Sequence, residues 1–272
     1  MSENILDIVK KFKHEGYVVV KNFLNKQTCD ELINYLSTLK AKVNLPYTNV
    51  PWGYGNLLNQ GPFSKISEHE FIKNFCQNLF NGNFVFNHLM VHNKAPWVGA
   101  GIEWHQEIFN IDTYAPGYTS DDWEKFVQIY IALEDQDVAN GCLKLVPGSH
   151  KLGVLPHEDA INDLLSHKRR VPYEIMQKIY KTNGIIETNL KAGDTLLFNH
   201  RIVHGSGSNA SPRSRKAIVL QARKNFLKKD EQVFSKETEY RKNFVISALQ
   251  EKINSISKKN VYLDMKKTDK VK

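Results

Sequence analysis

The sequence contains few cysteines and no long apolar run. Its 272 residues include three cysteines, Cys29, Cys76 and Cys142, which lie far apart and form no Cys-x-x-Cys pair. This spacing argues against a disulfide framework and against a thiolate zinc site. No stretch approaches the roughly 18 consecutive apolar residues that a membrane-spanning helix needs, and the first residues contain no apolar segment followed by a small-residue cleavage site. We therefore expect a cytoplasmic, soluble protein with reduced thiols and no membrane span.

Motifs for nucleotide or nucleic-acid binding are also missing, including a phosphate-binding glycine loop, a dinucleotide fingerprint and a recognition-helix pattern. The net charge is +8, but residues 224–272 contain 13 Lys and Arg against 7 Asp and Glu, a net charge of +6. Residues 1–223 therefore carry only +2, and nucleic acid is not an expected partner. The division of charge suggests a catalytic domain over residues 1–223 and a basic helical extension over residues 224–272.

Short strand-like segments joined by Gly, Pro and Asn turns make up much of the chain. The predicted strands cover residues 17–20, 84–92, 127–133, 142–146, 195–198 and 217–222. Helical spacing of apolar residues predicts one helix after Asn25, which can act as its N-cap, and another over residues 70–79. We expect a mainly β fold with flanking helices, namely a double-stranded β-helix, which is a cupin-like jelly roll.

Two connecting segments predict particular conformations. The Asn140-Gly141 pair predicts a tight type I′ turn between two of the strands. Residues 41–63 are irregular and rich in Pro, Gly and aromatic side chains. They form either a lid or substrate wall, or a loop that its aromatic residues merely anchor.

A candidate metal site combines a His-x-Glu pair with one distant histidine. Residues i and i+2 of a β-strand project from the same face, so His105 and Glu107 can point into one barrel mouth. His204 follows 97 residues after Glu107. Two imidazoles and a carboxylate form the facial triad of non-haem Fe(II) oxygenases, which leaves positions open on the metal. A His-x-Glu pair alone is more often a surface or core pair, so it needs supporting residues.

The segment after His204 contains these supporting residues. Arg215 stands 11 residues after His204, at the entrance of an apolar strand. A guanidinium binds a carboxylate through two parallel hydrogen bonds, as the distal carboxylate of 2-oxoglutarate requires. Ser206 lies two residues after His204 and can add a hydroxyl donor from the same face. The alternative is that the arginines are solvated, which we expect for Arg213 and not for Arg215.

Together these segments resemble the phytanoyl-CoA dioxygenase family of iron- and 2-oxoglutarate-dependent oxygenases. The resemblance runs from Phe12 to Ala222, which is most of the chain. Its marks are GYVVVKNFL, WHQE, IALEDQDVANGCLKLVPGSH and GDTLLFNHRIVHGSGSN, together with Arg215. These marks are specific in combination, although none decides the family singly.

The resemblance implies a role for each candidate residue. The catalytic Fe(II) ion would be held by His105, Glu107 and His204. The distal carboxylate of 2-oxoglutarate would form a salt bridge with Arg215, in a pocket lined by Met90, Tyr130, Ser206 and Gln106. The implied reaction uses O₂ and 2-oxoglutarate to hydroxylate a small-molecule substrate, with release of succinate and CO₂.

The carboxylate position departs from the family pattern, which usually has Asp where this chain has Glu107. Glu is one methylene longer, so the carboxylate geometry or the backbone must adjust. Related halogenases have Gly or Ala at this position, so Glu107 favours hydroxylation over halogenation. Substrate-binding loops vary in the family, and the candidates for the substrate side are Tyr47, Trp52, Tyr54 and Trp97. We expect a monomer or a homodimer.

Two other classes of function remain open at this point. A non-catalytic cupin-like protein could retain the fold and a bound metal or ligand, although a degenerate site would be free to lose any of the candidate residues. A zinc-dependent hydrolase or isomerase could use the same triad, but Arg215 and Ser206 would then have no task. Absence of succinate formation would separate both from an oxygenase.

Overall fold

The structure is a computed structural model of the chain and describes residues 4–40, 43–44, 51–55, 57–107, 126–160 and 169–225. The predicted C-terminal extension after residue 225 and the candidate Tyr47 lie outside the described residues. No helix in the described ranges is long and apolar enough to cross a membrane.

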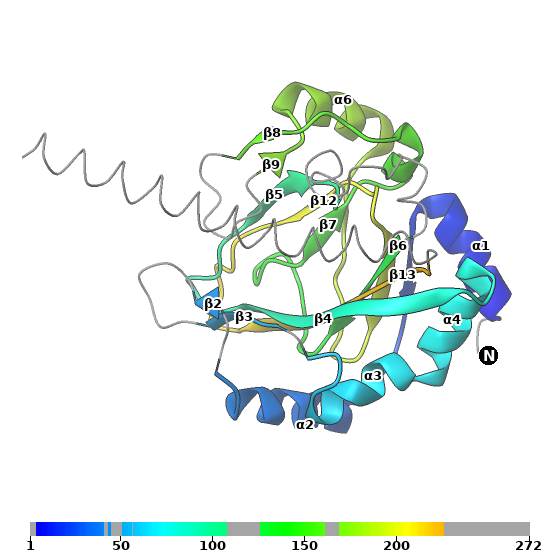
Figure 1. The fold of residues 1–272 in the computed structure, drawn as a ribbon. Helices are drawn as coiled ribbons and strands as arrows, with labels where there is room; N and C mark the ends of the chain where they lie inside the picture. The colour runs from blue at the N-terminus through cyan, green and yellow to red at the C-terminus, as the bar shows by residue number, and fades with distance from the viewer. Residues whose placement is uncertain are drawn as a thin grey trace, which may run out of the picture. The chain divides into compact units, whose positions relative to one another are not determined.

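Two antiparallel sheets form the body of the fold (Figure 1). The seven-stranded sheet has the order β1 (Tyr17–Val20), β11 (Thr195–Asn199), β6 (Phe126–Ala132), β13 (Arg215–Lys224), β4 (Phe84–Lys94), β3 (Pro51–Tyr54) and β2 (Val43–Asn44). The four-stranded sheet has the order β10 (Ile186–Glu187), β7 (Leu143–Leu145), β12 (His204–Ser206) and β5 (Ile102–His105). A further pair joins β8 (Glu158–Asp159) to β9 (Arg169–Arg170).

Side chains of the large sheet alternate between two apolar clusters, as the pleat requires. On β13, Ile218 and Leu220 belong to the cluster beneath the helices, whereas Ala217 and Val219 belong to the cluster between the sheets. The second cluster also includes Leu145 of the small sheet. The barrel interior therefore lies between the two sheets, and the inward-facing residues of β13 are the odd-numbered ones from 215 to 221.

Helices cover the outer face of the large sheet. The N-terminal helical elements are α1 (Ile5–Glu15), α2 (Lys26–Ser37), η1 (Gly61–Phe63), α3 (Ser64–Glu68) and α4 (Glu70–Phe80). In Figure 1, α2 and α3 lie on the side of β4 away from the small sheet. A later helix, α6 (Tyr173–Asn183), packs through Met176 and Ile179 on Val146 and Val203, outside the small sheet, and η3 (Ser149–Leu152) precedes it.

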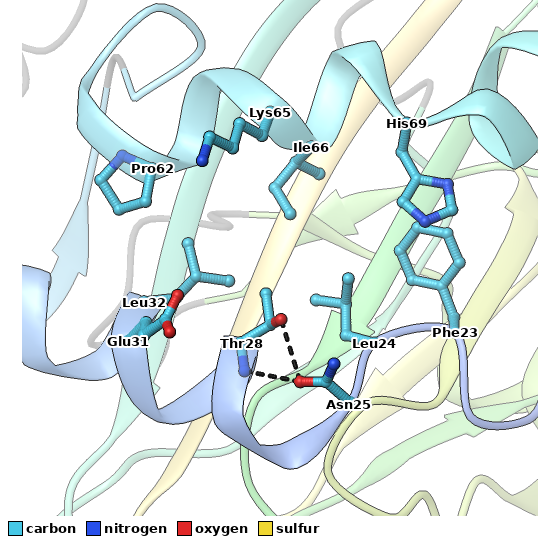
Figure 2. Close-up of a pocket in the computed structure, with 10 residues that line it drawn as sticks. All are labelled: Phe23, Leu24, Asn25, Thr28, Glu31, Leu32, Pro62, Lys65, Ile66 and His69. Atoms are coloured by element: carbon cyan, nitrogen blue, oxygen red, sulfur yellow. Dashed lines mark hydrogen bonds between the residues drawn. The ribbon is translucent and has the colours of Figure 1, made fainter.

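The predicted N-terminal element is confirmed. The Asn25 side chain caps α2 by accepting a hydrogen bond from the Thr28 N–H at 2.8 Å. Figure 2 shows a hollow beside this cap, between α2 and the η1–α3 segment. It is lined by Phe23, Leu24, Asn25, Thr28, Glu31, Leu32, Pro62, Lys65, Ile66 and His69. None of the residues predicted for the active site lines it, so it is not the predicted pocket.

Two local predictions were wrong. The Asn140-Gly141 pair does not form a type I′ turn, because only Gly141 has a positive φ, and the flanking strands β6 and β7 belong to different sheets. The segment 41–63 is not wholly irregular, because residues 51–54 form β3 and pair with β4. Residues 51–54 are held by a strand far away in the sequence, whereas the Asn140 side chain hydrogen-bonds to the backbone of its own connection.

Gly193 lets the turn before β11 approach the chain before α2. Its φ is +89°, and a Cβ atom would lie 2.0 Å from the carbonyl oxygen of Leu24. We predict that Gly193→Ala lowers the free energy of unfolding by more than about 3 kcal/mol, since it adds a backbone clash to left-handed strain. Gly82→Ala is the control, because Gly82 has a φ of +77° and a Cβ atom there would lie 3.9 Å from Nε2 of the Gln77 side chain.

Urea unfolding followed by circular dichroism measures both variants. The control is expected to lose only about 1–2 kcal/mol, the cost of left-handed backbone for a residue with a Cβ atom. Equal losses in the two variants would contradict a close approach at Gly193.

Candidate active site

Three side chains of metal-binding type converge where β5 meets β12. His105 ends β5, Glu107 follows two residues later, and His204 begins β12. The strands are antiparallel, with His105 directly opposite His204. One ligand atom from each side chain lies within 4.8 Å of the other two. Within the described part of the chain, no second group of three or more His, Cys, Asp or Glu side chains is arranged in this way.

The Glu107 carboxylate faces both imidazoles. Its Oε1 lies 3.2 Å from Nε2 of His204 and 3.8 Å from Nε2 of His105. On the other side of each ring, Nδ1 of His105 lies 2.7 Å from the Glu103 carbonyl oxygen, and Nδ1 of His204 lies 3.0 Å from that of Ile202. A carbonyl can only accept, so each Nδ1 carries the proton and each Nε2 directs a lone pair toward the carboxylate. Backbone carbonyls orient metal-binding imidazoles in this way.

Glu107 lies just outside β5, so the prediction that both residues of the His-x-Glu pair sit in one strand was wrong. The strand ends at His105, and the Glu107 N–H donates to the His200 carbonyl oxygen at 2.9 Å. This turn still brings Glu107 to the same side as His105. Because its backbone is free of the strand ladder, a side chain one methylene longer than Asp can reach both imidazoles.

The protonation states suit a metal site. Burial by itself would raise the pKa of Glu107, but the facing side chains of His105 and His204 lower it well below the ordinary value. Burial, followed by the neighbouring His105, lowers the pKa of His204. A carboxylate and neutral imidazoles are the forms that bind metal ions.

A buried guanidinium lies on the opposite wall of the barrel, at the start of β13. Arg215 is 1% exposed, and its Nη1 donates to the Gly141 carbonyl oxygen at 2.8 Å. Its Cζ lies 5.7 Å from the centre of the Tyr130 ring. Its Nε has no hydrogen-bond partner, and no carboxylate within the described ranges pairs with it. Burying a charge without a counter-charge is costly, so this position is suited to an anionic ligand.

Lys94 is a second buried cation beside Arg215, and the sequence analysis missed it. The two residues are partners in the register of β4 with β13, and Lys94 is 1% exposed. Its Nζ donates to Ser206 Oγ at 2.8 Å and to the Gly207 carbonyl. Strand alternation could have identified Lys94, because it shares the strand face of Met90, but the predicted strand ended at residue 92. Through the hydrogen bond that it accepts, Ser206 lies beside Lys94, the register partner of Arg215.

Comparison with known proteins identifies the family. The sequence profile described as phytanoyl-CoA dioxygenase (PhyH) matches residues 12–217, which is more than half of the chain. The chain belongs to the phytanoyl-CoA dioxygenase family. The membership predicted from the sequence motifs is therefore confirmed.

Curated relatives of this phytanoyl-CoA dioxygenase family member are dioxygenases. It is 25% identical to the ectoine dioxygenase of Halomonas elongata over 234 residues, which cover 79% of this chain and 69% of the relative. It is 31% identical to the peroxisomal phytanoyl-CoA dioxygenase of Bos taurus over 141 residues, which cover 50% of this chain and 38% of the relative. The chain thus spans well under half of the bovine enzyme. The predicted enzyme class, a dioxygenase, agrees with both relatives.

Solved structures show the same fold. EctD from S. alaskensis in its apoform has a TM-score of 0.67 at 16% identity, over 82% of this chain and 79% of that chain. The epimerase SnoN, in complex with Fe3+, alpha ketoglutarate and nogalamycin RO, has a TM-score of 0.62 at 18% identity, over 81% and 83%. At such identities the likeness shows the fold alone, and the predicted jelly roll is confirmed.

Several other predicted residues of this family member lie inside the barrel. Met90 and Tyr130 are both register partners of Val219, one from each neighbouring strand. Trp52, predicted for the substrate side, packs on Met90 and stacks on His92 with ring centres 5.0 Å apart. Burial lowers the pKa of His92 to about 3, so this imidazole is neutral. From the sequence, His92 is expected to be a core or rim residue rather than a metal ligand, and it shares the inward face of β4 with Met90.

Gln106 was predicted to lie near the co-substrate, and its contacts contradict this. Its Nε2 donates to the carbonyl oxygens of Gly153 at 2.9 Å and Arg201 at 2.7 Å, and its Oε1 accepts from the Leu155 N–H at 2.9 Å. The side chain is fully buried. Gln106 therefore braces the backbone behind the triad. Its side chain points away from those of its chain neighbours, His105 and Glu107.

Two substrate-side candidates also lie away from the barrel interior. Tyr54 packs against the apolar cluster beneath the helices. Trp97 is 66% exposed and has a φ of +64°, which is uncommon for a bulky residue. Of the aromatic candidates within the described residues, Trp52 alone contacts the inward-facing wall.

The contacts of Gln106 generate a prediction about stability. Gln106→Leu leaves two carbonyls and one N–H, at buried or half-buried positions, without their partner, so the free energy of unfolding should fall by about 2–4 kcal/mol. The affinity of the folded variant for 2-oxoglutarate should stay unchanged. Urea unfolding and calorimetric titration measure the two quantities. Gln27→Leu, on the exposed face of α2, is the control and should lie within about 0.5 kcal/mol of wild type.

A stable Gln106→Leu variant with weakened 2-oxoglutarate binding would instead return Gln106 to the co-substrate pocket.

Proposed function

We propose that this chain is an Fe(II)- and 2-oxoglutarate-dependent dioxygenase that uses O₂ to hydroxylate a small molecule, releasing succinate and CO₂. The observation that carries the proposal is the His105, Glu107 and His204 triad inside a jelly roll that also buries Arg215. Structures of the same fold support it, since EctD is described both with bound Fe and with 2-oxoglutarate and 5-hydroxyectoine.

The residues present fit both groups. Two imidazole nitrogens and one carboxylate oxygen are a donor set that suits Fe(II) and leaves open positions on the metal. Arg215 has an unpartnered buried Nε next to its terminal nitrogens, so it can bind a carboxylate through two hydrogen bonds. Ser206 and Lys94 add a hydroxyl and an ammonium group on the same side. This end of the barrel therefore suits the distal carboxylate of 2-oxoglutarate.

Bound iron and 2-oxoglutarate would together supply the oxidant, because this chemistry belongs to the cofactors. The chain contributes binding, orientation and a dry pocket. The backbone carbonyls behind His105 and His204 hold the imidazoles in one tautomer, and Glu107 provides the anionic ligand. The presence of this carboxylate supports hydroxylation over halogenation.

The finer assignments are also proposals. Residues 1–223 form the catalytic domain, and residues 224–272 form a basic helical extension. The last strand, β13, ends at Lys224, which supports a boundary near this position. Trp52 forms part of the substrate wall. We place the protein in the cytoplasm, acting as a monomer or a homodimer on a small molecule.

The test is anaerobic titration of apo-protein with Fe(II) and 2-oxoglutarate, read by the weak visible charge-transfer band of the chelate. Wild type should give the band, and His105→Ala should lose it. Arg215→Met should weaken 2-oxoglutarate binding by roughly 30-fold to 1000-fold, because losing one partner of a buried charge pair costs about 2–4 kcal/mol. Arg213→Met is the matched control, since Arg213 is exposed and pairs with Asp137 at 2.6 Å.

Other outcomes separate the alternatives. A wild-type protein without the band favours the non-catalytic binding protein. A hydrolytic or isomerase activity with Zn²⁺ and no succinate favours the zinc enzyme. Equal effects of Arg213→Met and Arg215→Met would remove the assigned role of Arg215.

A further inference from the structure

A cluster of buried and half-buried amides lines the barrel interior on the far side of the triad from Arg215. We call Asn87, Gln128, Gln221 and the ring of His200 the amide cluster. Gln221 faces inward on β13, six residues after Arg215, so the two side chains start about 20 Å apart at the strand rise of 3.3 Å per residue. Gln128 is its register partner on β6.

The triad lies between these two ends of the barrel. At one end, Ser206 of the His204 strand accepts a hydrogen bond from Lys94 beside Arg215. At the other end, the Glu107 N–H donates to the carbonyl oxygen of His200 at 2.9 Å. A ligand at the amide cluster would therefore approach the metal from the side opposite the predicted co-substrate carboxylate.

Hydrogen bonds within the amide cluster run in one direction. Asn87 Nδ2 donates to Gln221 Oε1, and Gln221 Nε2 lies 3.2 Å from Nε2 of His200. Since the amide nitrogen must donate, His200 Nε2 accepts. The His200 ring is held flat against Phe126, with ring centres 4.9 Å apart and planes at 28°. Burial lowers the pKa of His200 to about 4, so the ring is neutral.

Two acceptor oxygens of the amide cluster have no partner within the described residues. They are Oδ1 of Asn87 and Oε1 of Gln128, and both atoms are buried. Gln128 as a whole is 6% exposed. Leaving a buried acceptor unpaired is costly, and an apolar side chain of the same size would fill the position at no such cost. In sites that bind polar ligands, such acceptors remain unpaired in the ligand-free protein, and the ligand then donates hydrogen bonds to them.

A β-bulge between β13 and β4 lies at the amide cluster. The register of β13 with β4 shifts between Gln221 and Ala222, and Asn87 is the residue that the shift leaves out of the pairing. Bulges redirect side chains and are frequent beside active sites. Here the bulge coincides with the residue that donates to Gln221.

We propose that the amide cluster binds the substrate and selects a molecule that presents N–H or O–H donors, such as an amine, amidine, amide or polyol, over an apolar acyl chain. The inference rests on the proposed function, because it places this molecule next to the metal triad. The unpaired oxygens of Asn87 and Gln128 accept hydrogen bonds from the ligand, and Phe126 and His200 form the adjoining wall.

The test compares Gln128→Leu with Gln77→Leu, which makes the same change at an exposed position of α4. Both variants should keep the charge-transfer band with Fe(II) and 2-oxoglutarate. Gln128→Leu should raise the melting temperature of the ligand-free protein by about 2–4 °C, because it removes a buried amide oxygen that has no hydrogen-bond partner. A structural role for Gln128 would instead lower the melting temperature.

Succinate release is then measured with two sets of probes. The donor-rich set contains free amino acids, polyamines, hexoses and hexosamines, and the apolar set contains fatty acyl-CoA thioesters. At least one donor-rich probe should stimulate wild type, and Gln128→Leu should raise its KM on the order of tenfold, which is the effect of one lost hydrogen bond. Gln77→Leu should leave this KM unchanged.

The two proposals fail in different ways. If wild type gives no charge-transfer band, the proposed function fails and the inference falls with it. If the band appears but acyl thioesters alone stimulate, or neither set does, the inference is overturned and the oxygenase remains. A wild-type KM in Gln128→Leu, or a lowered melting temperature, also overturns it, since the amide cluster would then hold only water or stabilise the fold.

Discussion

The antiparallel pairing of β12 with β5 is the interaction on which the candidate site depends. It sets His204 opposite His105, although the two residues lie 99 positions apart and β6, β7, β10 and β11 come between them in the chain. A shift of one residue in this pairing would turn His204 out of the interior, because strand side chains alternate between faces. The turn after β5 then adds Glu107 through its hydrogen bond to the His200 carbonyl. The metal-binding geometry is thus a property of strand register.

The large sheet separates stability from chemistry by using its two faces differently. On β13, Ile218 and Leu220 pack beneath the helices, while Arg215 and Gln221 face the interior. Burial of apolar surface on the outer face stabilises the fold. Charged and amide groups on the inner face reduce that stability, because each is removed from water. One strand therefore supports the core and presents two chemically distinct ends of the pocket, one cationic and one rich in hydrogen-bond acceptors.

Local signals predicted the elements whose causes are local. The β-branched run before Asn25 and the capping side chain of Asn25 itself predicted β1 and α2, and both are present. The same reasoning failed at Asn140-Gly141. There the Asn140 side chain hydrogen-bonds to the backbone of Asp137 and Asp135 within a connection between two sheets. A dipeptide carries no information about which sheet the next strand will join.

The sequence by itself determined the fold class, the family and the types of metal-binding residue, since residue chemistry and spacing suffice for these. Arg215 could also be predicted, because the strand that follows it is evident from its apolar residues. Only the tertiary structure decided that Gln106 braces the backbone, that Lys94 joins Ser206, and that the amide cluster forms around Gln221. Alternation along one strand says which side chains share a face, but the register between distant strands decides which of them meet.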